Sequence, residues 1–130
     1  MKAGPPVNSD PQPQLVLQGT GDGLAVAAVA GALDIHTAQD LHEQATAVPA
    51  THPHLVLDMS QVTFCDSSGL NTLLRLRRHA AAAGGSLALA AVPGQAMRML
   101  SVTDTDAVFT LHSRPAQALA DHATRRRPSS

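Results

Sequence analysis

Short apolar runs alternate along the chain with segments in which apolar residues recur every three or four positions. The short runs, rich in Leu, Val and Ala, are typical of buried β-strands, and they lie at 15–17, 24–30, 54–59, 86–91 and 107–111. The periodic segments are typical of amphipathic helices, and they begin near Asp34, Asp66, Pro93 and Pro115. In the last of these helices, Leu119 and Ala123 are expected to face the core.

This alternation predicts the element order β-β-α-β-α-β-α-β-α. The turn cluster at 19–23 indicates a hairpin between the first two strands, and residues 62–65 are expected to form a short crossing segment after the strand at 54–59. Strands separated by single helices are expected to pair in parallel through right-handed crossovers. Gly84-Gly85 is expected to end the second helix in a left-handed C-cap. The predicted fold class is therefore α/β: one central mixed sheet of about five strands packed against about four α-helices.

Composition fits a single domain with polar ends. The chain has 130 residues, of which 44% are hydrophobic but only 2% aromatic, so Leu, Val and Ala must form the core. Residues 1–13 contain four prolines and little apolar surface, which predicts a disordered N-terminal arm. Residues 125–130 (RRRPSS) are predicted to be a polar C-terminal tail. The folded domain is then expected at 14–124.

Charge and cysteine content narrow the functional classes. The formal net charge is −1, so no basic field draws the chain to nucleic acid or to a membrane. The absence of Trp and Tyr leaves no stacking platform for single-stranded nucleic acid. The single Cys65 cannot form an internal disulfide, and neither a signal-peptide core nor a transmembrane stretch is evident. We therefore expect a cytoplasmic protein without direct nucleic-acid or membrane partners.

The most informative segment is the polar turn 66–69 (DSSG) between a buried strand and a helix. Ser and Asp are favoured at helix starts because their side-chain oxygens accept from unpaired N–H groups of the first turn. One interpretation is therefore a simple cap. The other is a hydroxyl presented to a partner, where an added phosphate would meet free N–H groups and the helix dipole. Its charge of about −1.5 to −2 would lie beside Asp66 and near Asp34, and would change the binding surface.

A family resemblance favours the second interpretation. Residues 66–70 (DSSGL), directly after a strand, resemble the phosphorylation motif of bacterial anti-sigma-factor antagonists, the STAS-domain family. Residues 31–34 (GALD) resemble that family's Gly-Glu-Leu-Asp segment, and 55–64 resemble its strand-and-crossing segment. The resemblance extends over about 15–123, in the element order of the family. It implies a STAS-like fold.

The resemblance also implies a partner and a switch. Members of this family bind an anti-sigma factor that is also a serine kinase, and this partner binds the ATP and magnesium. The unphosphorylated member sequesters the kinase and frees the sigma factor, the phosphorylated member releases it, and a phosphatase of the PP2C type resets the cycle. The chain itself then needs no cofactor and is not an enzyme.

The resemblance places the phosphoacceptor at Ser67. The partner-binding residues that it implies are Asp34, Asp66, Ser67, Ser68, Gly69 and Asn71. Two positions depart from the family pattern, because Ala32 stands where Glu is common and Asn71 where Gly often follows DSSGL. Both departures bear on the choice of partner, and neither removes the acceptor. The alternative hypothesis is a scaffold domain of the same fold that joins a multiprotein signalling complex and is never phosphorylated.

Other candidate chemistry is poorly supported. His52 and His54 lack the companion ligands that a metal site needs. Ser67 does not lie in a Gly-x-Ser-x-Gly elbow, which argues against a hydrolase. The glycines at 19, 21 and 23 lead into a strand instead of a helix, so they indicate a turn and not a nucleotide site. Cys65 is expected to pack beside Phe64, and Arg75 and Arg78 to share a solvated helix face.

Overall fold

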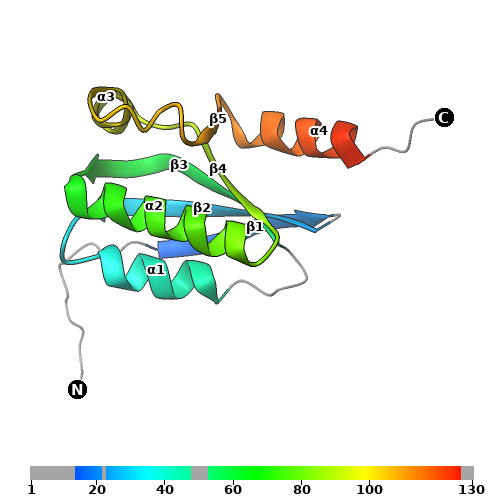
Figure 1. Cartoon of the computed structure of the whole chain (residues 1–130), viewed down its shortest axis with the longest axis horizontal. Helices are drawn as coiled ribbons and strands as arrows, with labels where there is room; N and C mark the ends of the chain where they lie inside the picture. The colour runs from blue at the N-terminus through cyan, green and yellow to red at the C-terminus, as the bar shows by residue number, and fades with distance from the viewer. Residues whose placement is uncertain (1–13, 22, 48–52, 127–130) are drawn as a thin grey trace, which may run out of the picture.

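A five-stranded sheet in the order β1-β2-β3-β4-β5 runs through the centre of the computed structural model, which describes residues 14–21, 23–47 and 53–126 (Figure 1). The strands are β1 (Gln14–Gly21), β2 (Leu24–Leu33), β3 (His54–Cys65), β4 (Ser86–Ala90) and β5 (Thr110–His112). β1 pairs with β2 in antiparallel fashion, and the pairs from β2 to β5 are parallel. The predicted hairpin between the first two strands is confirmed, but its turn is shorter than 19–23. Gly19 and Gly21 belong to β1 and pair with Val26 and Leu24, so β1 is longer than the predicted 15–17 and, of the three glycines, only Gly23 lies in the turn.

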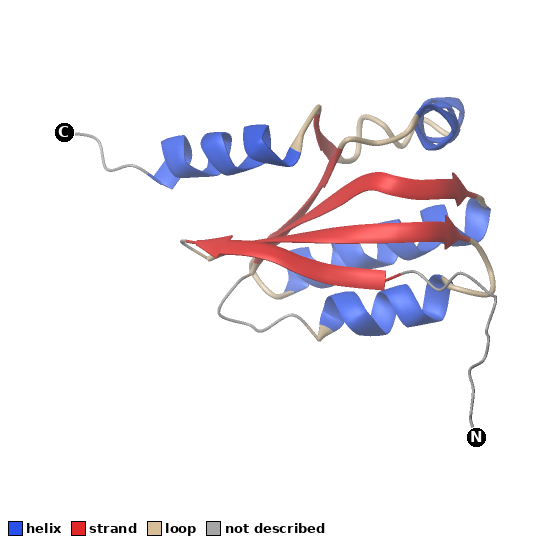
Figure 2. Cartoon of the chain, turned by 180° about the vertical axis from the view of Figure 1, so that it is seen from behind, coloured by secondary structure: helices blue, strands red, loops and turns tan. Residues whose placement is uncertain are grey.

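Four helices accompany the sheet: α1 (Ala38–Thr46), α2 (Ser67–Ala82), α3 (Gly94–Val102) and α4 (Pro115–Arg126). α1 and α2 lie side by side on one face, α4 lies toward the other face, and α3 lies near the carboxyl ends of β2 and β3 (Figures 1 and 2). The predicted mixed sheet of five strands with four helices is therefore confirmed.

The two faces of the sheet carry cores of different size. Alternate residues of a strand point to opposite faces. The larger core lies under α1 and α2 and includes Leu57, Met59, Leu73 and Leu89, all almost fully buried. Full burial of one such side chain contributes about 1.5–3 kcal/mol relative to an exposed one. The smaller core lies toward α4 and consists of Leu24, Val26, Val56, Ala88, Ala90 and Ala118.

Three further local predictions need correction. The segment expected to cross after 54–59 is part of one continuous β3 strand of 12 residues, whose pairing with β2 shifts register twice. β5 begins only at Thr110, because the amides of Val108 and Phe109 donate to the Thr105 carbonyl and close a turn instead. Phe109 is then buried in the larger core.

The third correction concerns α4. Leu119, expected to face inward, is 42% exposed, whereas Ala118 is buried against the smaller core. The sheet is lined there by Ala88 and Ala90, so a small side chain lets the helix approach closely. α4 extends to Arg126, past the expected boundary at 124. The side chain of Ala123, the predicted arm at 1–13 and residues 127–130 of the tail predicted at 125–130 lie outside the described residues.

The ends of α2 and β4 have clear backbone causes. Gly84 has φ +81°, and the Gly85 amide donates to the Ala80 carbonyl at 2.8 Å, so the expected left-handed C-cap of α2 is confirmed. β4 ends at Ala90 because Ala91 adopts φ +55°, which turns the chain out of the sheet and toward α3. β3 consequently continues beyond the end of its β4 partner.

Candidate phosphorylation and partner-binding site at the start of α2

The two motifs of the resemblance meet at the carboxyl ends of β2 and β3. Leu33 and Cys65 are paired across these parallel strands, so Asp34 and Asp66 follow neighbouring strand ends. The Asp66 amide donates to the Leu33 carbonyl at 3.0 Å, which continues the strand pairing into the turn. The fold thus brings together the GALD and DSSG segments, which are more than 30 residues apart in the sequence.

Asp66 is the N-cap of α2. Its Oδ1 accepts from the amides of Ser68 at 2.8 Å and Gly69 at 3.1 Å, and its backbone is extended. Ser67 is therefore the first helical residue and not the cap. Its side chain is exposed, and within the described part of the chain its hydroxyl makes no hydrogen bond.

This geometry corrects one expectation about a phosphate at Ser67. The amides of Ser68 and Gly69, which were expected to be free for the phosphate, already donate to Asp66. Among the described residues, neither Asp34 nor Asp66 forms an ion pair. Added charge at Ser67 would therefore lie beside uncompensated carboxylates instead of being absorbed by the first turn.

Two glycines allow the close approach of these segments. A Cβ at Gly69 would lie 2.5 Å from the Leu33 carbonyl oxygen and 2.7 Å from the Leu33 Cβ, so only glycine lets α2 start directly against β2. Gly31, the first residue of GALD, has φ +97° and lies at a register shift between β2 and β3. That backbone conformation favours glycine, and it sets the direction in which the chain leaves β2.

Asp34 is held by its own loop. Its Oδ1 accepts from the His36 amide at 2.9 Å, and its amide donates to the Thr37 hydroxyl at 3.0 Å. The buried Thr37 hydroxyl in turn donates to the Ala32 carbonyl at 2.7 Å. Ala32 thus contributes through its backbone, and this contact does not require the Glu that is common at that position.

An exposed surface surrounds Ser67. Asn71 lies one turn further along α2 and is exposed, and Ser68 is half-buried. Two apolar side chains were missed at the sequence level, namely Phe64 at 44% and Ile35 at 72% exposure. Period-two alternation gave no signal for Phe64, because it would place Phe64 on the same face as the buried Val62. The register shift between β2 and β3 at this point breaks the alternation and leaves Phe64 exposed.

Cys65 lies under this surface and is unreactive. It is buried, and burial together with the neighbouring Asp66 raises the pKa of its thiol to about 11. The thiol therefore stays protonated at neutral pH, where it is a poor nucleophile.

Further along α2, Arg75 and Arg78 are exposed as expected. Burial, Arg75 and His79 lower the pKa of His42, which faces α2 from α1.

A third residue missed at this end is Gln95, in the first turn of α3. Its Oε1 accepts from the Cys65 amide at 2.9 Å, and its Nε2 donates to the Cys65 carbonyl at 2.9 Å. No motif marks this residue, because the contact joins positions 30 apart and depends on where α3 starts. The chain segment leading into Asp66 and Ser67 is thus held from the side of α3.

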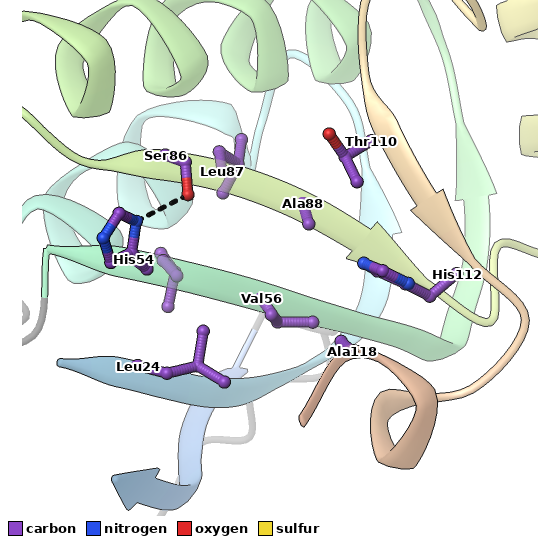
Figure 3. Close-up of a pocket in the computed structure, with 10 residues that line it drawn as sticks. Leu24, His54, Val56, Ser86, Leu87, Ala88, Thr110, His112 and Ala118 are labelled. Atoms are coloured by element: carbon purple, nitrogen blue, oxygen red, sulfur yellow. Dashed lines mark hydrogen bonds between the residues drawn. The ribbon is translucent and has the colours of Figure 1, made fainter. Parts of the chain in front are cut away.

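A pocket of about 300 Å³ lies between the sheet and α4, and its polar ends are bridged internally (Figure 3). His54 Nδ1 and Ser86 Oγ are 2.8 Å apart at one end, and His112 Nδ1 lies 3.5 Å from Asp121 Oδ2 near the other.

His52 lies outside the described residues, and within them no three His, Cys, Asp or Glu side chains converge as metal ligands. No helix in the described part of the chain is long and apolar enough to cross a membrane.

Comparison with known proteins defines the class. Residues 16–112 match the family described as "Mlab, STAS domain", so the chain belongs to the STAS-domain family. Over 83 residues it is 28% identical to a STAS-domain containing protein of Pseudomonas aeruginosa, covering 64% of this chain and 82% of that protein.

Solved structures agree with this membership. An anti-sigma factor antagonist from Mycobacterium paratuberculosis superposes with a TM-score of 0.71 at 29% identity, covering 83% of this chain and 92% of the other. The STAS domain of a SulP transporter from Vibrio cholerae shares the fold, with a TM-score of 0.67 at 18% identity over 82% of this chain and 86% of that domain. The fold thus occurs both in anti-sigma-factor antagonists and in transporter domains.

Proposed function

We propose that this chain is an anti-sigma-factor antagonist that binds an anti-sigma factor serine kinase and is released when Ser67 is phosphorylated. The observation that carries the proposal is the exposed hydroxyl of Ser67, which has no hydrogen bond to any described residue, on a backbone fixed by Asp66 and by the contact of Gly69 with Leu33. The 29% identity with an anti-sigma factor antagonist over most of both chains supports the same function.

The surface around Ser67 suits a protein partner. Phe64 and Ile35 are exposed beside polar groups from two adjacent strand ends, and exposed apolar side chains rimmed by polar ones are typical of protein interfaces. The proposed partner-binding residues are Asp34, Asp66, Ser67, Ser68, Gly69 and Asn71, with Ile35 and Phe64 added. Gly69 acts there through its backbone, since it is buried.

The mechanism is electrostatic. A phosphate adds about −1.5 to −2 charges at Ser67, and the amides of Ser68 and Gly69 are already occupied by Asp66. The added charge therefore acts on the partner and leaves the fold in place. A penalty of about 1.4 kcal/mol weakens binding tenfold. A partner whose interface fits a neutral hydroxyl beside two carboxylates is thereby released, and a PP2C-type phosphatase in the cytoplasm would restore binding.

The test is isolation of the partner followed by site mapping. Tagged protein should co-purify with an anti-sigma factor carrying a serine kinase domain, and that kinase with ATP and magnesium should modify Ser67. Modification of Ser68 alone would contradict the assignment. Stable association with a complex that contains no kinase would favour a scaffold role, as in a transporter assembly.

A further inference from the structure

β3 has an open edge beside the Ser67 site. β4 pairs with β3 only from His54↔Ser86 to Asp58↔Ala90, so no described strand lies along that side of residues 59–65. An unpaired strand edge leaves backbone donors and acceptors that need partners. Near the end of this edge, the chain must leave the strand and form the cap of α2.

The Gln95 side chain occupies the place of the missing strand at Cys65. A primary amide offers one acceptor and a donor in nearly the arrangement of a peptide unit. Gln95 uses both toward a single residue, accepting from the Cys65 amide and donating to its carbonyl, each at 2.9 Å. This is the exchange that two directly opposed residues make in a hydrogen-bonded antiparallel pair.

The contact fixes the two peptide units that flank Cys65. One of these units belongs to the exposed Phe64 and the other leads into the cap residue Asp66. Gln95 is itself positioned by α3, whose Ala96 and Leu100 are buried in the larger core. α3 lies beside this strand end in both views (Figures 1 and 2).

We infer that Gln95 is a positioning residue for the Ser67 switch, and that it couples α3 to the phosphorylation site through the backbone of Cys65. The inference rests on the proposed function of Ser67. Loss of the contact leaves the acceptor hydroxyl of Ser67 in the chain, but it should let the end of β3, and with it the position of Ser67, vary. Phosphorylation by the cognate kinase should then slow by about tenfold, as expected for two lost hydrogen bonds of ordinary strength.

Gln95→Glu gives the sharpest test. The introduced carboxylate still accepts from the Cys65 amide but places a negative oxygen against the Cys65 carbonyl. When this carboxyl is protonated in acid, it again offers one donor and one acceptor. The protection of the Cys65 amide against exchange, followed by NMR and compared with the wild type at the same pH, should be low at pH 7.5 and return toward the wild-type value near pH 4. Gln95→Leu should show low protection relative to the wild type at both pH values.

Gln117→Glu is the matched control. Gln117 uses only its side-chain oxygen within the described residues, accepting from the amide and hydroxyl of Ser113 at the start of α4. A carboxylate can do the same, so this variant should match the wild type in Cys65 exchange and in phosphorylation rate.

Phosphorylation rates at pH 7.5, measured well below every melting temperature, complete the experiment. The inference is supported if both Gln95 variants are phosphorylated slowly while the Gln117 variant is phosphorylated at the wild-type rate. It is also supported if acid restores the protection of the Cys65 amide in Gln95→Glu but not in Gln95→Leu. Wild-type rates in both Gln95 variants overturn the positioning role and leave the proposed function intact, as would Cys65 exchange that is unchanged by either substitution. A wild-type chain that the kinase does not modify at Ser67 overturns the proposed function and the inference together.

Discussion

Polar side chains near the start of β3 bond to one another, whereas the serine that follows its end keeps its hydroxyl available. Along the amino-terminal half of β3, Ser86 bonds His54 at the strand start, and His112, which lies further along the sheet, is close to Asp121. Polar side chains around the pocket are thus engaged with one another. At the carboxyl end of β3, the backbone is held by Asp66, Gln95 and the Leu33 carbonyl, while the side chain of Ser67 stays unbonded within the described residues. A fixed backbone that presents an available side chain is what a recognition site requires.

Gly69→Ala should have the largest effect at the carboxyl end. The added Cβ would meet backbone of Leu33 at 2.5 Å, so α2 must move away from β2. We expect a loss of about 2–3 kcal/mol in the free energy of unfolding, together with slower phosphorylation of Ser67. Urea unfolding monitored by circular dichroism measures the first quantity.

Gly94→Ala is the control for this substitution. Gly94 also lies in the first turn of a helix, but its added Cβ would lie 3.7 Å from Arg98 Nη1, an ordinary contact. This variant should be as stable as the wild type or slightly more stable. Equal losses in the two variants would show that the contact between Gly69 and Leu33 is not what limits the site.

Two substitutions of Asp66 should distinguish its role as the cap of α2 from the effect of its negative charge. Asp66→Ala removes the acceptor for two amides and should cost about 1 kcal/mol of stability. Asp66→Asn keeps a capping oxygen, so its melting temperature should stay near that of the wild type, while the loss of one negative charge should reduce the penalty of a phosphate at Ser67. If the Asp66→Asn variant, once phosphorylated at Ser67, released the partner as readily as the phosphorylated wild type, Asp66 would have no part in the charge effect.

Cys65 should make the carboxyl end sensitive to alkali. Its thiol has a pKa of about 11 when folded against 9.0 in the reference state. Below pH 9 both states keep the proton, whereas between pH 9 and 11 the unfolded chain loses it first, so stability falls as the pH rises. After allowance for screening by water, the expected loss is about 1 kcal/mol.

The chain is well suited to this measurement because it contains no tyrosine and only one lysine. Few other side chains titrate in that range. Cys65→Ala should therefore show a flatter dependence of melting temperature on pH between 9 and 11 than the wild type. Parallel curves for the two proteins would mean that the thiol does not cause the alkaline loss.

Features that depend on residues close together in the sequence could be predicted, whereas features that depend on contacts between distant segments could not. The strand and helix patterns, the Gly84 cap and the meeting of GALD with DSSG depend on periodicity and short motifs, and these were predicted. The position of β5 and the inward face of α4 were missed because they depend on the Thr105 turn and on the small Ala88 and Ala90 opposite Ala118. Gln95 was missed because its role arises from a strand that β4 leaves unpaired.

The identity of the cap also needed coordinates. The sequence indicated a cap within the DSSG turn at 66–69 but did not show which side chain provides it. Asp66 is the cap, so Ser67→Ala should change the stability by less than about 0.5 kcal/mol. The stability of Ser67→Asp should equal or exceed that of Ser67→Ala, since the helix dipole favours a carboxylate in the first turn by about 0.3–1 kcal/mol.

The affinity of the partner kinase for Ser67→Ala and Ser67→Asp, measured by titration calorimetry, tests the charge switch most directly. Ser86→Ala and Ser86→Asp serve as controls, since Ser86 is exposed and pairs with His54 at the opposite end of β3 from Ser67. Ser67→Ala should bind within about threefold of the wild type, Ser67→Asp at least about tenfold more weakly, and both Ser86 variants like the wild type. Equal affinities of Ser67→Ala and Ser67→Asp would contradict the charge switch and favour a scaffold that is never phosphorylated.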